Sequence, residues 1–314
     1  MKFKITIILL LIMLVCNLNA ISDKAGTSGF AFLKINYSAR AMGMGNAFTG
    51  LANDGDAVFF NPAGILQNKT KHIKTTYMSY IDGLYGGSIV YSTEYKNGWH
   101  IAPFVQFLVS ESIPRTFELN GNYGGVDGSF NTSNVVFGLA LATEIHEVLD
   151  AGFNVKYLSD KLDSYSASAI ALDLSLLHQT NNPNLKIGAS LKNIGKQLSY
   201  YTQAKYKEKL PLTATVGASY KYLDKGFINL DICRPFDNDF FGRLGLEYYY
   251  NKYFSLRTGL DSRMNDYRTD ESLDFMSGIS FGAGFNWNQY TLDYAASSFG
   301  SLGFVNQISI SYNF

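Results

Sequence analysis

From residue 71 onward, apolar and polar residues alternate along the chain, and this two-residue period constrains the fold more than any other feature. Successive side chains of a β-strand point to opposite faces, so each such stretch has one apolar and one polar face. In the stretch 151–157, Ala151 and Phe153 belong to one face, and Gly152 and Asn154 belong to the other. The sequence therefore predicts an all-β fold of about fourteen antiparallel strands. The predicted strands are 71–81, 84–95, 99–110, 133–145, 149–160, 165–178, 185–194, 210–223, 227–235, 240–250, 253–262, 275–287, 290–298 and 303–314.

The lengths of the connections indicate that these strands close into a transmembrane barrel. The three longest connections are 111–132, 195–209 and 263–274, and all three follow odd-numbered predicted strands. Transmembrane barrels have short turns at the periplasmic end and longer loops at the outer end, and each strand needs ~10 residues to cross the membrane. A soluble barrel with its apolar face inside shows the same alternation, so the separation of short from long connections is what favours the membrane.

The composition agrees with a membrane barrel and excludes several classes of protein. Charged residues make up 17% of the chain and aromatic residues 15%, whereas soluble domains carry roughly 25% charged residues. Basic and acidic residues number 26 each, so no basic excess is present to bind nucleic acid. The four histidines lack metal-ligand spacing, and the chain has no nucleophile elbow, P-loop or dinucleotide fingerprint. We therefore expect no metal, no cofactor and no enzymatic activity.

Residues 1–20 are predicted to be a signal peptide. Lys2 and Lys4 precede an apolar run, 5–15, that is too short to cross a bilayer as a helix, and Ala20 offers a small residue at a plausible cleavage point. Cys16 leaves a lipoprotein signal as an alternative. After cleavage only one cysteine remains in the chain, so no intrachain disulfide is expected.

The last strand, 303–314, carries a second signal. Apolar and polar residues alternate along it, and it finishes on Tyr312, Asn313 and Phe314. This pattern resembles the C-terminal strand of a bacterial outer-membrane barrel. The resemblance implies that Tyr312 and Phe314 are read by the outer-membrane assembly machinery, and that the barrel wall contacts outer-membrane lipid. We therefore expect the protein in the bacterial outer membrane.

Residues 21–70 differ from the rest of the chain and predict a partly helical plug inside the barrel 71–314. A barrel of about fourteen strands encloses a lumen wider than its own side chains fill. The segment is rich in Gly and Ala, which pack closely, and it has too many apolar residues for a loose tail. Its motif residues are Gly43, Gly45, Asp54, Asp56, Asn61, Pro62 and Gly64. Because buried charges need partners, Asp56 and Asn61 are expected to pair with lumen residues such as Lys156, Arg243 or Arg257.

The sequence GMGNAFTGLANDGDAVFFNPAGI, which begins at Gly43, resembles the N-terminal signature of the FadL-type outer-membrane transporter superfamily. Within that superfamily, the run AGTSGFAFLKINYSARAMGMG, which begins at Ala25, is most similar to the PorV/PorQ-like branch. The resemblance implies a fourteen-stranded barrel whose N-terminal segment folds into the lumen as a hatch.

Pro103 is the only proline inside a predicted strand. Proline has no N–H for the ladder, so a central strand must bulge or kink at this position. In the FadL-type family the third strand carries a kink that opens the wall toward lipid, and the resemblance therefore implies a lateral opening at Ala102, Pro103 and Phe104. A simple bulge without any role in transport is the alternative.

Two functions of different classes follow from the resemblance. The PorV/PorQ-like branch implies a scaffold or shuttle in protein export, which acts with type IX secretion components. The wider superfamily implies passive transport of long-chain fatty acids or other hydrophobic solutes through a plugged barrel. A transporter needs an apolar path from the outer loops past the plug, whereas a scaffold needs exposed loops that bind partners.

Overall fold

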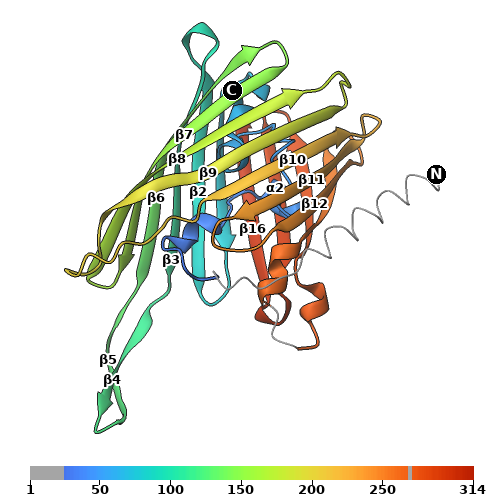
Figure 1. Ribbon diagram of the computed structural model, residues 1–314. Helices are drawn as coiled ribbons and strands as arrows, with labels where there is room; N and C mark the ends of the chain where they lie inside the picture. The colour runs from blue at the N-terminus through green and yellow to red at the C-terminus, as the bar shows by residue number, and fades with distance from the viewer. Residues whose placement is uncertain (1–24, 268–270) are drawn as a thin grey trace.

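In the computed structural model, which describes residues 25–267 and 271–314, fourteen antiparallel strands close into a barrel (Figure 1). Sequence neighbours pair throughout, except that β3 pairs with β6 and β1 closes the barrel against β16. The barrel strands are β1 His72–Ser79, β2 Leu84–Glu94, β3 His100–Ser110, β6 Thr132–His146, β7 Leu149–Leu162, β8 Tyr165–Gln179, β9 Leu185–Ser199, β10 Thr213–Lys221, β11 Gly226–Pro235, β12 Phe241–Tyr249, β13 Phe254–Asp261, β14 Ile279–Trp287, β15 Tyr290–Ser298 and β16 Phe304–Asn313. The predicted number and direction of the strands are confirmed.

The alternating faces of the strands point apolar side chains outward and polar side chains into the lumen. In β8, Leu174 and Leu176 are 51% and 45% exposed, whereas Asp173 and Ser175 are 2% and 6% exposed. In a water-soluble barrel the apolar side chains point inward and the polar side chains point outward. A closed barrel with an apolar outer surface is the architecture of the bacterial outer membrane, and the protein belongs there.

The two ends of the barrel differ in the length of their connections, as predicted. At the end where the C-terminus lies, the connections are 95–99, 147–148, 180–184, 222–225, 250–253 and 288–289. The opposite end carries the long connections. One of them, 200–212, lacks strands and helices, and another, 262–278, contains η4 Ser262–Tyr267 and η5 Asp274–Met276. We call the end with the long connections the outer end, following the rule for membrane barrels.

The predicted loop 111–132 has structure of its own. It forms a two-stranded sheet from β4 Ile113–Leu119 and β5 Asn122–Phe130, which projects from the outer end of the barrel (Figure 1). The register of this hairpin shifts twice, between Pro114 and Thr116 and between Phe117 and Glu118. The many glycines and the polar residues of this segment hide the strand pattern in the sequence.

The plug fills the lumen with four short helical elements, η1 Ala31–Lys34, α2 Ala39–Gly43, α3 Ala57–Phe60 and η2 Pro62–Gln67. Met44, Phe48 and Phe60 of the plug are at most 2% exposed, and they join wall residues in one apolar core. The Ser38 hydroxyl caps α2 by accepting a hydrogen bond from Ala41 N at 3.1 Å. The predicted signal peptide, 1–20, lies outside the described residues. No helix in the described part of the chain is long and apolar enough to span a membrane.

Because one face of each strand points to lipid, a charge on that face should lower the free energy of unfolding by an amount that depends on its depth in the bilayer. Leu174→Arg, near the middle of β8, should destabilise the barrel in lipid vesicles by about 2–4 kcal/mol, because the cation meets the centre of the bilayer. Leu198→Arg, near the outer end of β9, is the matched control and should cost about 0–1 kcal/mol. Urea unfolding in vesicles measures both. Equal costs for the two variants would contradict the placement of the membrane.

Candidate functional site

The plug meets the wall backbone to backbone at its glycines. A Cβ atom on Gly43 would lie 3.0 Å from the α-carbon of Gly282 in β14. Gly45 has a φ of +61°, and a Cβ atom there would lie 2.6 Å from the backbone nitrogen of Leu260. A side chain at either position would push the plug away from the wall. Gly43 and Gly45 of the predicted motif are thus placed where the segment touches the barrel.

The wall carries a matching set of glycines, which we call the glycine belt. A Cβ atom on any of them would lie within 3.0 Å of a plug atom. The belt consists of Gly152, Gly188, Gly217, Gly245, Gly259 and Gly282. The belt was not predicted from the sequence, although lumen-facing glycines in the middle of several strands are the signal that marks it. Glycine weakens a strand, so its repeated use there fits close approach of another backbone.

Polar side chains of the wall satisfy backbone groups of the plug. The Asp231 carboxylate of β11 accepts hydrogen bonds from Phe48 N at 3.1 Å and from Thr49 N at 3.0 Å. Ser280 accepts from Gly45 N at 2.9 Å. Further wall contacts of this kind are Ser309 with Ala39 N, Ser175 with Ala63 N, Asn154 with Val58 O, and Lys192 with Phe59 O. Irregular backbone buried in a barrel requires such partners, so the polar lumen and the plug fit each other.

A chain of buried ion pairs ties the plug to the inner end of the wall. Arg40 of α2 contacts Glu247 of β12 at 2.7 Å and Asp54 of the plug at 3.2 Å. Lys74 of β1 contacts Asp54 at 3.1 Å and Asp56 at 2.5 Å. The chain continues through Arg257 of β13, which lies 2.7 Å from both Glu247 and Asp293. We call these residues the charge chain.

The remaining plug motif residues hold the segment together. Asn61 donates through Nδ2 to Thr49 O at 2.9 Å and to Leu176 O of β8 at 3.0 Å. Pro62 occupies the first turn of η2, where its missing N–H costs nothing. A Cβ atom on Gly64 would lie 2.0 Å from Ala52 O. Asp56 pairs with a lumen residue as expected, but that residue is Lys74 and none of the three named in the prediction. The expected side-chain partner was wrong for Asn61, which bonds to backbone carbonyls.

Burial and neighbouring charges shift the pKa values of Asp54 and Asp56, the two carboxyls of the plug, in opposite directions. Burial raises the pKa of Asp56 from 3.8 to about 6, and the neighbouring Asp54 carboxylate adds to this effect, although Lys74 opposes it. Burial also acts to raise the pKa of Asp54, but Lys74 and Arg40 outweigh it and hold that pKa well below its usual range. The two carboxyls therefore differ sharply in how easily they take up a proton.

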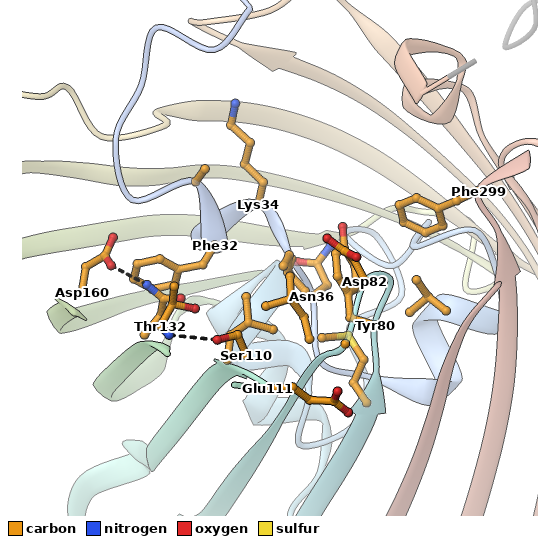
Figure 2. Close-up of a pocket in the computed structure, with 18 of the residues that line it drawn as sticks. Phe32, Lys34, Asn36, Tyr80, Asp82, Ser110, Glu111, Thr132, Asp160 and Phe299 are labelled. Atoms are coloured by element: carbon orange, nitrogen blue, oxygen red, sulfur yellow. Dashed lines mark hydrogen bonds between the residues drawn. The ribbon is translucent and has the colours of Figure 1, made fainter. Parts of the chain in front are cut away.

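Two cavities lie on opposite sides of the plug. The outer cavity has a volume of about 1010 Å³ and lies among η1, the ends of β1 to β3 and the start of β4 (Figure 2). Its apolar lining includes Phe32, Tyr80, Leu108 and Phe299. The inner cavity, of about 230 Å³, is lined by the residues of the charge chain other than Asp56. Helix α2 separates the two, since Met42 lines the outer cavity and Arg40 the inner one.

Pro103 interrupts the ladder between β2 and β3. The two strands pair at Val90–Phe104 and again at Thr93–Ile101, but the two residue pairs between these positions are missing. The register is unchanged, and β3 pairs with β6 without a break. Ala102 and Phe104 are buried facing the lumen, whereas Pro103 is exposed on the outer surface.

Phe104 fills the lumen side of this interruption. Its ring lies edge to face against Phe59 of the plug, with 5.5 Å between the ring centroids, and it covers Gly138 of β6. The cavity beside it has a volume of about 20 Å³. The lateral opening stays a prediction, and its position coincides with a plug contact.

The predicted targeting residues lie at the inner end of β16. Phe314 N donates to Lys71 O at 2.9 Å, which joins the chain end to the start of β1. The Tyr312 ring lies 4.9 Å from both the Phe314 ring and the Tyr290 ring of β15. Recognition of these residues by the assembly machinery stays a prediction.

Comparison with solved structures gives the fold. The chain is similar to the Pseudomonas putida toluene transporter TodX, with a TM-score of 0.63 and 12% identity over 88% of this chain and 98% of that one. It has a FadL-type barrel fold. The CymD monoaromatic hydrocarbon channel matches with a TM-score of 0.60 and 11% identity over 89% of this chain and 98% of that one. A Pseudomonas aeruginosa FadL homologue matches with a TM-score of 0.54 and 12% identity over 95% of this chain and 99% of that one. No family model and no curated protein matches the sequence.

The glycine belt predicts that a single methyl group in the wall loosens the plug. In Gly259→Ala, the new Cβ atom would lie 2.1 Å from Gly45 N, a backbone atom that cannot turn aside. We expect a larger single-channel conductance in planar bilayers. Ala283→Val, on the lipid-facing side of β14, is the control and should leave conductance unchanged. A conductance of Gly259→Ala equal to that of the wild type would contradict the close contact between Gly259 and the plug backbone.

The raised pKa of Asp56 predicts a pH dependence that Asp56→Asn removes. Between pH 3.8 and about 6, the Asp56 carboxyl is protonated to a greater extent in the folded protein than in the unfolded chain. The stability that Asp56 contributes is therefore present below pH 3.8 and is lost as the pH rises through about 6. Thermal unfolding in detergent should show the wild-type midpoint falling relative to Asp56→Asn across this range. Parallel curves for the two proteins would rule this out.

Proposed function

We propose that this protein is a passive channel that admits small apolar compounds through the outer membrane. The observation that carries the proposal is the outer cavity of about 1010 Å³, which lies at the outer end of a closed barrel and presents aromatic and aliphatic side chains. Ligand sites of this size are typically apolar with a few polar groups. A toluene transporter and a monoaromatic hydrocarbon channel share the fold, which supports the same function for this chain.

The plug makes this a gated channel in our proposal. The charge chain lines the inner cavity, and an apolar solute gains nothing by entering a chamber lined by Arg40, Lys74 and Glu247. An apolar solute in the outer cavity therefore needs either movement of the plug or a way through the wall. The ladder interruption at Pro103 supports the wall route, because fewer hydrogen bonds join β2 and β3 there. Displacement of Phe59 from Phe104 would accompany such an opening.

The β4–β5 hairpin favours a second candidate, a scaffold in protein export. Phe117, Leu119 and Tyr123 are 45%, 60% and 71% exposed. The hairpin that carries them projects beyond the barrel, where another protein can reach it (Figure 1). Type IX secretion components are the partners that this second candidate proposes. We favour the channel because a scaffold needs no large cavity above a sealed plug.

Filling the outer cavity tests the channel. Leu108→Trp places a larger side chain in the cavity lining, and we expect uptake of the apolar dye N-phenylnaphthylamine by cells carrying the protein to fall several-fold. Leu174→Trp, on the lipid-facing surface, is the matched control and should leave uptake unchanged. Equal uptake by both variants at equal abundance in the outer membrane would contradict the proposal. Co-purification of secretion proteins that is lost on removal of residues 113–130 would support the scaffold instead.

A further inference from the structure

We infer that the outer cavity selects apolar compounds with a positively charged, hydrogen-bond-donating head group and disfavours carboxylates. This inference rests on the proposed function and names the class of compound that the cavity takes. Three independent features of the cavity support it, namely its charge, a buried acceptor and its aromatic rings.

The lining of the outer cavity has an excess of negative charge. It contains four acidic side chains, Asp82, Glu111, Asp160 and Asp261, and two basic ones, Lys34 and Arg263. Figure 2 shows Asp82, Glu111 and Asp160 placed around the cavity. Within the part of the chain that the structure describes, none of these three acids forms an ion pair, whereas both basic side chains do.

Both cations of the lining are occupied by neighbouring groups. Lys34 Nζ lies 2.5 Å from the Asp237 carboxylate. Arg263 donates to Lys34 O at 3.1 Å, and its guanidinium lies 3.8 Å from Asp261. The Asp261 carboxylate is shared, because it also accepts a hydrogen bond from Arg243 Nε at 3.0 Å, and Arg263 Nε is buried without a hydrogen-bond partner among the described residues. A bound carboxylate would therefore compete with Asp237 or Asp261 for its counter-ion.

A buried acceptor in the cavity lining calls for a donor on the ligand. Gln307 of β16 is 3% exposed, and its Oε1 atom has no hydrogen-bond partner. Its Nε2 atom donates to Asn36 O at 2.8 Å, and exchanging the two amide atoms would place an acceptor against that carbonyl. An unsatisfied buried acceptor is costly, and an ammonium or hydroxyl group can supply the missing proton, whereas a carboxylate cannot.

Aromatic rings complete the site. Phe32, Tyr80, Tyr201 and Phe299 all line the cavity, and the Tyr80 and Phe299 rings meet edge to face with 5.7 Å between centroids. Aromatic faces attract organic cations and also pack against the apolar body of a ligand. Near Tyr201, Asp160 accepts a hydrogen bond from Asn134 Nδ2 at 2.7 Å, which fixes the carboxylate within the lining. An amine with an aromatic or aliphatic body matches the three acids, the Gln307 acceptor and the aromatic rings together.

Three probes with one body and different heads test the inference. Phenylbutylamine, phenylbutanol and phenylbutyrate are titrated calorimetrically into the full-length protein in an uncharged detergent at low ionic strength and neutral pH. We expect the amine to bind about fivefold more tightly than the carboxylate, with the alcohol between them, since partly exposed charges act weakly through water. The double variant Asp82→Asn, Glu111→Gln should reduce this preference to about twofold or less. The matched control, Glu118→Gln with Asp127→Asn on the hairpin, should leave it unchanged.

A second variant distinguishes the contribution of the Gln307 acceptor to binding from that of the acidic side chains. Gln307→Met removes the unpaired oxygen and should weaken the amine and the alcohol but leave the carboxylate unaffected, with heat-modified electrophoretic migration confirming that the barrel is folded. Equal affinities for the three probes, or tighter binding of the carboxylate, would overturn the inference and leave the channel proposal standing. Absence of binding by all three would overturn both, because the cavity would then take no apolar compound.

Discussion

The contact between the plug backbone and the glycine belt is the constraint on which the rest of this structure depends. A barrel of fourteen strands cannot fill its own lumen with side chains, so a separate segment must close it. Gly43 and Gly45 reach Gly282 and Gly259 at distances that leave no room for a Cβ atom. Side chains at these positions would lift the plug from the wall, and the hydrogen bonds from the Phe48 and Thr49 backbone to Asp231 would then be lost.

The same contact explains why the lumen is polar. The plug has little regular structure, so many of its backbone groups need partners from the wall, and serine, asparagine and aspartate side chains supply them. The charge chain then compensates the charged residues that the plug brings into the barrel. Since Arg40 and Asp54 of the plug contact Glu247 and Lys74 of the wall, the plug and the inner end of the barrel form one electrostatic unit.

The sequence predicts the barrel well, because the alternation that marks a strand is visible within the strand itself. The period of two residues predicts the strands, and the lengths of the connections distinguish the two ends of the barrel. The role of the wall glycines was not predicted, because nothing in the sequence around each glycine shows which plug residue lies against it. Gly217 and Gly259 acquire their role only when register brings them opposite Gly50 and Gly45 of the plug. The choice of Lys74 as the partner of Asp56 likewise depends on where the plug settles in three dimensions.

The candidate site was partly predictable for the same reason. The motif residues Gly43, Gly45 and Asn61 were found because the plug segment is rich in Gly and Ala and resembles the N-terminal signature of the FadL-type superfamily. The outer cavity was not found, since Phe32, Leu108 and Phe299 come from three distant parts of the chain. The hairpin at 113–130 was predicted to be a loop, because its glycines and shifts of register break the alternation that marks a strand.

Hydrogen–deuterium exchange of the plug amides in bilayer nanodiscs tests most directly whether the plug is docked on the wall. The amides of Gly45, Phe48 and Thr49 donate to wall side chains, so they should exchange as slowly as the strand amides of β10. Exchange of these amides as fast as that of Gly121 at the hairpin tip would show that the wall does not hold the plug, and would contradict a barrel sealed by backbone contact.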